Sequence, residues 1–318
     1  MRVRLIAMDL DGTLNNDQKA IDPPTRDALM EAQTRGVRLA LASARPLPGL
    51  YRERDALELS GHGGLLMAYN GGVIADAATG SWLSASPMDM EDARGVLRAL
   101  EALPVTPILD DGARFYVTDR DGYMVQYECM NNRMNCVEVP NLAQALDFAP
   151  FKLLMSADAG HIRSLQRQIA ELLPPGLAVV QTAAFYLEVI PACVNKGEGL
   201  RAICRVAGID LSETVAFGDS ENDIPMLEAA GLGVAMGNAD AAVKAAADRV
   251  TRSNNENGIA AALEEILQVH RYCSACGFAV TVEGGQVPLR DNPLTDFAWL
   301  SSIIRPQNLQ GRHFSSGK

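Results

Sequence analysis

The chain has 318 residues, 48% of them hydrophobic and 21% charged, which is the composition of an ordinary globular protein and does not favour disorder as the default. The 28 lysines and arginines against 39 aspartates and glutamates leave a net charge of -11, so neither nucleic acid nor an anionic membrane surface is expected as a partner. No apolar stretch approaches the roughly 20 residues that span a bilayer, and the first apolar run is too short for a signal peptide. We therefore expect a cytoplasmic protein.

The first 70 residues predict alternating strands and helices. An apolar run at residues 5–8 is followed by a helix that Asp22 can cap and that Gly36 can close. Two further apolar runs lie at residues 37–42 and 65–69. Strands that are apolar throughout and separated by a helix are typical of a parallel sheet buried on both faces.

The pattern changes in the middle of the chain. Residues 83–192 contain shorter alternating segments, as at 114–118 and 151–156, with helical stretches at 90–103 and 161–173. The strand and helix rhythm returns after residue 192, so the outer thirds are expected to form one α/β domain, residues 1–82 with 193–268, around an inserted α+β segment.

The last part of the chain, residues 269–318, loses this rhythm. We expect a C-terminal extension of unknown role, with a weakly alternating segment at 278–282 and a disordered polar end at 307–318. Cys273 and Cys276 form a CxxC pair, but without a second ligand pair this is weak evidence for zinc.

Acidic or hydroxyl side chains follow the predicted parallel strands at the point where each strand ends. Asp9 and Asp11 follow the first strand, Ser43 follows the second, and Asp219 follows a later strand at residues 214–217. Ligand crevices of open α/β sheets lie at the carboxyl ends of the strands, so these side chains should converge. Several carboxylates in one crevice require a cation, and oxygen ligands suit Mg²⁺ better than zinc.

The segment DLDGT supplies two carboxylates that can take different tasks. Asp9 can act as nucleophile and metal ligand, and Asp11 can act as acid and base. Gly12 allows a sharp turn that exposes backbone amides to an anion. A calcium-binding EF-hand is the alternative, but Leu14 stands where that loop needs glycine and Ala20 where it needs glutamate.

Three other residues, Ser43, Arg45 and Lys196, are ambiguous when taken alone, whereas the segment GDSENDIPML is a second strong signal. Ser43 and the following amide could hold a phosphoryl oxygen, although serine in this place is usually a helix cap, and Arg45 could be solvated. Lys196 lies at a helix start, where a cation is disfavoured unless it binds phosphate, although it could also be a surface lysine. In the segment GDSENDIPML, Asn222 fits an ordinary N-cap cluster, whereas Asp219 at the end of a buried strand does not.

DLDGT, Ser43, Lys196 and GDSENDIPML, in this order, resemble the four motifs of the haloacid dehalogenase-like phosphatases, specifically the Cof-type branch. The resemblance covers about residues 1–265. It implies a Rossmann-like parallel-sheet core with an α+β cap domain inserted between the second and third motifs. The turn at Asn70 and Gly71 also resembles a segment of this branch, without a clear chemical role.

The resemblance also implies the roles of individual residues. Asp9 would be the nucleophile and Asp11 the acid and base, which makes these two the catalytic residues. Mg²⁺ would be held by the Asp9 carboxylate, the Asp11 backbone carbonyl and Asp219, with Asp223 orienting these ligands. Phosphate would be held by the following residues: Ser43, Lys196, Asn222 and the amides near Leu10 and Ala44.

We therefore expect a Mg²⁺-dependent phosphatase that hydrolyses a small phosphorylated metabolite, of the sugar phosphate, flavin mononucleotide or pyridoxal phosphate type, through a phosphoaspartate intermediate. Two alternatives stay open. A phosphomutase would use the same nucleophile but return the phosphoryl group to the substrate, and a metal- or phosphate-binding module would not catalyse at all. The sequence does not identify the substrate, the oligomeric state or the cap residues that set specificity.

Overall fold

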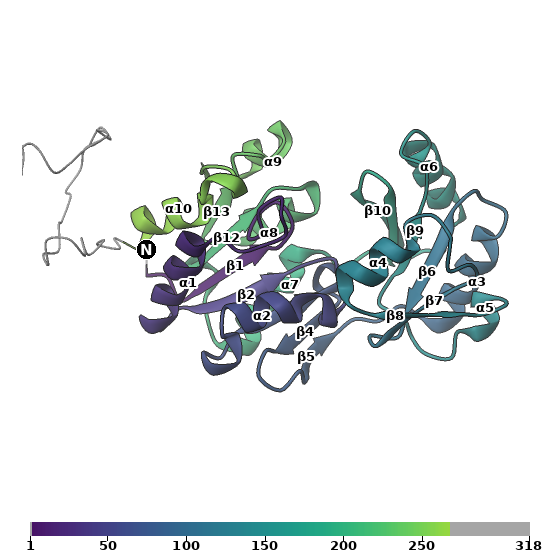
Figure 1. The fold of residues 1–318 in the computed structure, drawn as a ribbon, viewed down its shortest axis with the longest axis horizontal. Coiled ribbons are helices and arrows are strands. Elements are labelled where there is room, and N and C mark those ends of the chain that lie inside the picture. The colour runs from purple at the N-terminus through teal and green to yellow at the C-terminus, as the bar shows by residue number, and fades with distance from the viewer. Residues whose placement is uncertain (1, 268–318) are drawn as a thin grey trace, which may run out of the picture. The chain divides into compact units, whose positions relative to one another are not determined.

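A computed structural model describes residues 2–267 of the chain, which contain two β-sheets with helices packed against them (Figure 1). The first sheet has eight strands, in the spatial order β14 (Arg249–Val250), β13 (Leu232–Ala235), β12 (Thr214–Gly218), β1 (Leu5–Asp9), β2 (Arg38–Ala42), β3 (Leu65–Ala68), β4 (Val73–Asp76) and β5 (Trp82–Ala85). The strands from β14 to β3 are parallel, and β4 and β5 are antiparallel.

Helices cover both faces of this first sheet because its strands are apolar on both sides. In β1, Ile6 and Met8 belong to one buried cluster and Leu5 and Ala7 to another, as the two-residue period of a strand requires. The first cluster includes residues of α1 (Pro23–Thr34) and α10 (Gly258–Ile266), and α2 (Tyr51–Ala56) contributes Tyr51 to it. The second cluster includes residues of α7 (Lys196–Ala207), α8 (Ile224–Ala229) and α9 (Ala241–Ala246). The result is the three-layer arrangement of an α/β core.

The second sheet lies between the two halves of the core in sequence. Its six strands have the order β10 (Leu177–Ala183), β11 (Tyr186–Pro191), β9 (Leu153–Ser156), β6 (Thr106–Asp110), β7 (Arg114–Val117) and β8 (Asn135–Glu138). One face packs on α3 (Met90–Leu100), α5 (Leu142–Ala145) and α6 (Ile162–Leu172). The other face contacts α4 (Val125–Asn132).

Short 3₁₀ helices connect several of these elements: Leu47–Leu50, Leu59–Gly61, Tyr69–Gly71, Leu211–Glu213, Glu221–Asp223 and Asn254–Glu256. No helix among residues 2–267 is long and apolar enough to cross a membrane.

The predicted fold class, an α/β core with an inserted α+β cap, is confirmed, whereas the domain boundaries stay predictions. Strands β4 and β5 were not predicted: β4 turns back antiparallel on the buried β3, and β5 pairs antiparallel with β4 at the edge of the sheet. Asp22 stands at the N-cap position of α1, but its carboxylate accepts a hydrogen bond from Asn16 rather than capping the helix. The predictions for residues 269–318, including the pair Cys273 and Cys276, lie outside the described residues.

The turn between β3 and β4 has an unusual backbone. Tyr69, Asn70 and Gly71 have φ values of 53°, 56° and 102°, and all three lie in the left-handed region that side chains other than those of glycine and asparagine rarely enter. A Cβ atom on Gly71 would lie 2.7 Å from the carbonyl oxygen of Asn195 and 3.1 Å from the Cα of Gly199. The turn therefore packs directly against the first turn of α7.

Replacement of Gly71 by alanine should destabilise the protein more than replacement of Gly80, which has φ 70° but no neighbour near its Cβ position. Gly80→Ala should cost about 1 kcal/mol from backbone strain alone. Gly71→Ala should cost about 3 kcal/mol, because overpacking against α7 adds to the strain. Urea unfolding followed by circular dichroism measures both, and equal midpoints would contradict close packing at Gly71.

Candidate active site

A buried lysine lies between two aspartates where β1 and β12 end. The Lys196 ammonium donates hydrogen bonds to Oδ1 of Asp9 at 2.5 Å and to Oδ1 of Asp223 at 2.6 Å. Lys196 is the first residue of α7, and the preceding Asn195 caps that helix by accepting a hydrogen bond from the Glu198 amide. The sequence left open a surface lysine at this position, but the side chain is fully buried.

Backbone turns hold the acidic residues of this cluster in place. Asp223 accepts hydrogen bonds from the amides of Asp219 and Ser220, both at 3.0 Å, and Thr13 donates to Asp219 at 2.7 Å. A Cβ atom on Gly12, whose φ is 86°, would lie 2.4 Å from an Asp219 carboxylate oxygen. Glycine is therefore required in DLDGT because the loop after β1 and the loop after β12 approach each other there.

Asp219 adds a third carboxylate beside the two that bind Lys196. Asp9, Asp219 and Asp223 each have one carboxylate oxygen that lies within 4.8 Å of the other two. Burial, together with the charges of Asp223 and Asp219, raises the pKa of Asp9 well above its ordinary value although Lys196 opposes this. Burial also raises the pKa of Asp219, to about 6. Burial is the largest cause of both shifts, and the charge of Asp223 adds to each. The all-oxygen donor set fits a hard divalent cation.

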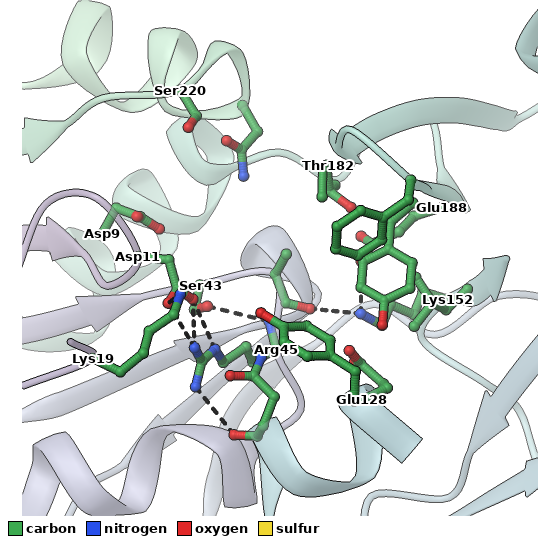
Figure 2. Close-up of a pocket in the computed structure, with 18 residues that line it drawn as sticks. Asp9, Asp11, Lys19, Ser43, Arg45, Glu128, Lys152, Thr182, Glu188 and Ser220 are labelled. Atoms are coloured by element: carbon green, nitrogen blue, oxygen red, sulfur yellow. Dashed lines mark hydrogen bonds and ion pairs between the residues drawn. The ribbon is translucent and has the colours of Figure 1, made fainter. Parts of the chain in front are cut away.

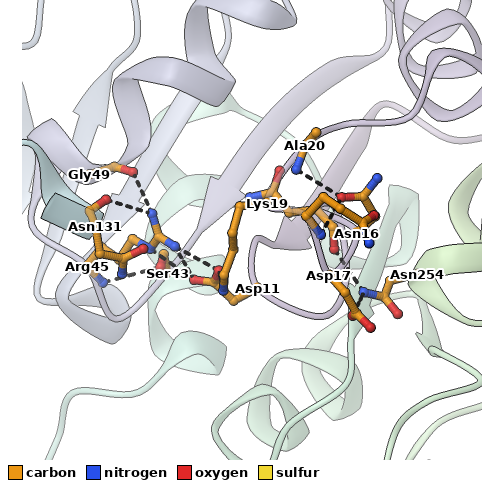
Figure 3. A network of polar contacts seen from close by, with 12 residues as sticks. Asp11, Asn16, Asp17, Lys19, Ala20, Ser43, Arg45, Gly49, Asn131 and Asn254 are labelled. Atoms are coloured by element: carbon orange, nitrogen blue, oxygen red, sulfur yellow. Dashed lines mark hydrogen bonds and ion pairs between the residues drawn. The ribbon is translucent and has the colours of Figure 1, made fainter. Parts of the chain in front are cut away.

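Asp11 belongs to a different network on the other side of the same loop. Arg45 binds its carboxylate through Nε at 2.9 Å and through one terminal nitrogen at 2.6 and 2.7 Å, and Lys19 donates to it at 2.5 Å (Figure 3). Another nitrogen of Arg45 donates to the carbonyl oxygens of Gly49 and of Asn131, which lies on α4. Arg45 is thus a buried residue rather than a solvated one.

This network determines the charge of Asp11. Burial alone would raise the pKa of Asp11, but the charges and hydrogen bonds of Arg45 and Lys19 outweigh it and hold that pKa below its ordinary value. The two cations therefore keep Asp11 ionised in this arrangement. A role as proton donor requires that the carboxylate leave Arg45 and Lys19.

A cavity of about 180 Å³ opens beside Asp9 and Asp11 (Figure 2). Of the predicted phosphate-binding residues, Ser43, Ala44 and Asn222 line this cavity, whereas the buried Leu10 and Lys196 are not among its lining residues. The side chains that were predicted to converge at the strand ends therefore do so in two separate groups. Lys196, Asp219 and Asp223 join Asp9 in the buried cluster, and the loops after β2 and β12 join Asp9 at the cavity.

The opposite wall of the cavity was not found from the sequence. Lys152 and Glu188 form a buried ion pair of 2.7 Å, and Lys152 also donates to the carbonyl oxygen of Ala44 at 2.9 Å. Glu128 is buried beside them, and burial is the main cause that raises its pKa. Figure 2 shows these three side chains on the cap side of the cavity. Charged residues within the apolar segments FKLLMS and YLEVIP were the available signal.

Comparison with known proteins agrees with the fold. A family model described as haloacid dehalogenase-like hydrolase matches residues 6–263, so the chain belongs to that family. YxeH of Bacillus subtilis, a protein named as a phosphatase, is 32% identical over 83% of this chain and 98% of its own. A phosphoglycolate phosphatase of Methanopyrus kandleri is 30% identical over 83% of this chain and 97% of its own.

Two further relatives complete the comparison. The 5-amino-6-(5-phospho-D-ribitylamino)uracil phosphatase YitU of Bacillus subtilis is 28% identical over 82% of this chain and 96% of its own. The crystal structure of a haloacid dehalogenase-like hydrolase from Bacteroides thetaiotaomicron superposes with a TM-score of 0.78 at 31% identity, covering 83% of this chain and all of that one. Family and relatives together identify the chain as a phosphatase of phosphoric monoesters, within the Cof-type branch.

Removal of the buried lysine charge should destabilise the protein in a pH-dependent way. Lys196→Met leaves buried carboxylates without their partner, and we expect a loss of about 3–5 kcal/mol near pH 8. Protonation of Asp9 in the folded variant removes the unpaired charge, so the folded variant binds more protons than the unfolded chain and the deficit should shrink toward pH 5. Urea midpoints across this pH range measure the effect.

Lys244→Met is the matched control, since Lys244 lies away from the cluster and donates one hydrogen bond to the carbonyl oxygen of Gly237. Its effect should be small and independent of pH. A Lys196→Met deficit that stays constant from pH 8 to pH 5 would count against a charge deficit at the cluster.

Proposed function

We propose that the chain is a Mg²⁺-dependent phosphatase in which the Asp9 carboxylate attacks phosphorus and forms a phosphoaspartate. The observation that carries this proposal is the buried cluster of Asp9, Lys196, Asp219 and Asp223 beside a cavity with polar walls. A carboxylate is a competent nucleophile when cations neutralise the phosphoryl oxygens that it approaches. Lys196 supplies one such cation directly at Asp9.

Mg²⁺ would be held by carboxylates of the cluster, with the Asp11 backbone carbonyl as a further ligand, and it would supply positive charge to the transferring phosphoryl group. Ser43, Asn222 and the amides of Leu10 and Ala44 would donate hydrogen bonds to the remaining phosphoryl oxygens. These donors fit a group that carries its charge on three equatorial oxygens.

Asp11 would protonate the leaving alkoxide and then activate the water that hydrolyses the phosphoaspartate. Its contacts with Arg45 and Lys19 keep it ionised. An ionised Asp11 suits the activation of water, but it must gain a proton before it can protonate the alkoxide. We propose that substrate competes for Arg45, because an anionic phosphoryl group near Ser43 offers this guanidinium another partner. Release of Asp11 then allows its protonation.

Replacement of Asp9 by asparagine should abolish phosphate release, because the amide is a poor nucleophile and a poor metal ligand. With p-nitrophenyl phosphate and Mg²⁺, we expect the wild-type rate to fall by at least about 10³-fold. Removal of Mg²⁺ with a chelator should reduce wild-type turnover comparably, and added Mg²⁺ should restore it. Release of inorganic phosphate rather than an isomeric phosphate ester distinguishes hydrolysis from mutase activity.

Asp27→Asn is the matched control, since that aspartate has a side chain that is 76% exposed on α1. It should retain full activity. Near wild-type turnover by a folded Asp9→Asn variant would overturn the assignment of the nucleophile.

The walls of the cavity favour a small leaving group rich in hydroxyl groups. The cavity volume of about 180 Å³ is below the roughly 300 Å³ at which ligand pockets usually begin, which favours a small leaving group over a flavin ring system. The hydroxyl oxygen of Thr182, which lines the cavity, is buried and has no hydrogen-bond partner among the described residues. A substrate hydroxyl would satisfy it.

Aromatic rings and carboxyl groups complete this wall. Tyr127 and Phe185 pack edge to face, with ring centroids 6.0 Å apart, and both line the cavity beside Glu128 and Glu188. Apolar ring faces beside hydrogen-bonding groups suit a sugar or a polyol, which has both C–H faces and hydroxyl groups. The nearby carboxyl groups disfavour a second phosphate on the same molecule.

A panel of phosphate esters should therefore rank in a definite order. With Mg²⁺ present, we expect kcat/KM to be highest for monophosphorylated sugars or sugar alcohols, lower for pyridoxal phosphate and lowest for flavin mononucleotide. Thr182→Val should lower kcat/KM about 10-fold for the best sugar substrate and leave that for p-nitrophenyl phosphate unchanged. Preference for flavin mononucleotide would contradict this assignment of the leaving-group site.

A further inference from the structure

The turn at Asn70, between β3 and β4, has no part in the chemistry proposed so far, yet it contacts several segments of the active site. The backbone amide of Asn70 donates to the carbonyl oxygen of Ser43 at 2.9 Å, and that of Tyr69 donates to the carbonyl oxygen of Arg45 at 3.0 Å. Gly71 packs on the first turn of α7, which begins at Lys196. A single left-handed turn thus contacts both the loop after β2 and the helix that positions the buried lysine.

The side chain of Asn70 is buried and uses both ends of its amide. Its Nδ2 donates to Oε2 of Glu188 at 3.2 Å, and its Oδ1 accepts from Nδ2 of Asn222 at 2.9 Å. Glu188 accepts from Lys152 through its other oxygen, and Lys152 also donates to the carbonyl oxygen of Ala44. The hydrogen bonds therefore form a continuous chain from the Ser43–Ala44 loop through the cap strands to Asn222.

Lys152 determines which group donates and which accepts in each of these consecutive hydrogen bonds. Lys152 can only donate, so Glu188 must accept, and an ionised Glu188 can accept only from the NH₂ group of Asn70. The Asn70 oxygen therefore faces Asn222 and receives one of its two N–H groups. The second N–H of Asn222 stays available as a donor at the cavity, which Asn222 lines.

We propose that Asn70 is a positioning residue that orients the Asn222 amide as a donor to the phosphoryl group and couples this orientation to the seating of the cap strands on the core. The proposal rests on the phosphate-binding role of Asn222 proposed above. Through its hydrogen bond to Asn70, Glu188 on the cap strand β11 would then influence the orientation of Asn222 on the core. A substrate that holds the cap in place also orients Asn222.

Asn70→Asp tests this coupling, because aspartate has the same shape and tolerates the left-handed conformation but cannot donate to Glu188. Two carboxylates would then face each other, and the chain of hydrogen bonds would break between cap and core. With p-nitrophenyl phosphate and Mg²⁺, we expect kcat/KM to fall on the order of 10- to 100-fold, with weaker inhibition by inorganic phosphate. Asn135→Asp, a change at an exposed asparagine of the cap strand β8, should have no effect.

The double variant Asn70→Asp, Glu188→Gln provides the rescue. In this variant the carboxylate belongs to the residue at position 70, on the core, and it accepts hydrogen bonds from Asn222 and from the NH₂ group of the new glutamine. The carbonyl oxygen of that glutamine accepts from Lys152. The net charge of the chain matches that of the wild type, and all three hydrogen bonds are possible again. Both kcat/KM and phosphate inhibition should return to within about threefold of the wild-type values, whereas Glu188→Gln alone should impair both.

A purely structural role would lower the urea midpoint and leave phosphate inhibition of the folded enzyme unchanged, and that result would overturn the proposal. Wild-type kinetics for Asn70→Asp, or failure of the double variant to recover, would also overturn it. Should Asn70→Asp not fold, Asn70→Gly keeps the backbone conformation and must show the same kinetic loss. Failure of the nucleophile assignment is seen separately, as activity of Asp9→Asn.

Discussion

The buried ion cluster of Lys196 with Asp9 and Asp223 is the interaction on which the rest of the active site depends. Burying a lysine is costly unless its charge is paired, and here Asp223 and Asp9 outweigh the effect of burial and raise the pKa of Lys196. The same pairing brings together the ends of β1 and β12 and the start of α7. Because Asp219 adds a further carboxylate, the cluster keeps an excess of negative charge that a divalent cation can neutralise.

The second organising feature is the polar contact between core and cap. Lys152 bonds to the carbonyl oxygen of Ala44, Arg45 to that of Asn131, and Tyr69 to the carboxylate of Asp110. These bonds join the loop after β2 and the turn after β3 to three segments of the cap: α4, β6 and the residue that precedes β9. Cap residues can therefore influence the loops proposed to bind phosphate without touching phosphorus, and this separation suits a family whose relatives are named for different phosphate esters.

Local chemistry explains why much of the core could be predicted from the sequence. Apolar runs at residues 5–8 and 37–42, with the helix between them, correspond to β1, α1 and β2 within one or two residues. Strands β4 and β5 were missed because a hairpin added at the edge of a parallel sheet has no distinct period in its short segments. Asp22 was predicted to cap α1, but its carboxylate accepts a hydrogen bond from the side chain of Asn16 instead. Which of these two hydrogen bonds forms depends on the conformation of the neighbouring loop.

The sequence by itself determined the fold class, the family and the set of residues that follow the core strands, because parallel strands bring their carboxyl ends to one edge whatever the length of the insertion. Only the tertiary structure decided which of those residues meet. Lys196 and Arg45, ambiguous in sequence, are buried and bonded to different aspartates of the same motif. Contacts of Asn70 with Asn222 and Glu188 span 152 and 118 residues, and hydrogen bonds over such separations leave no local pattern in a single chain.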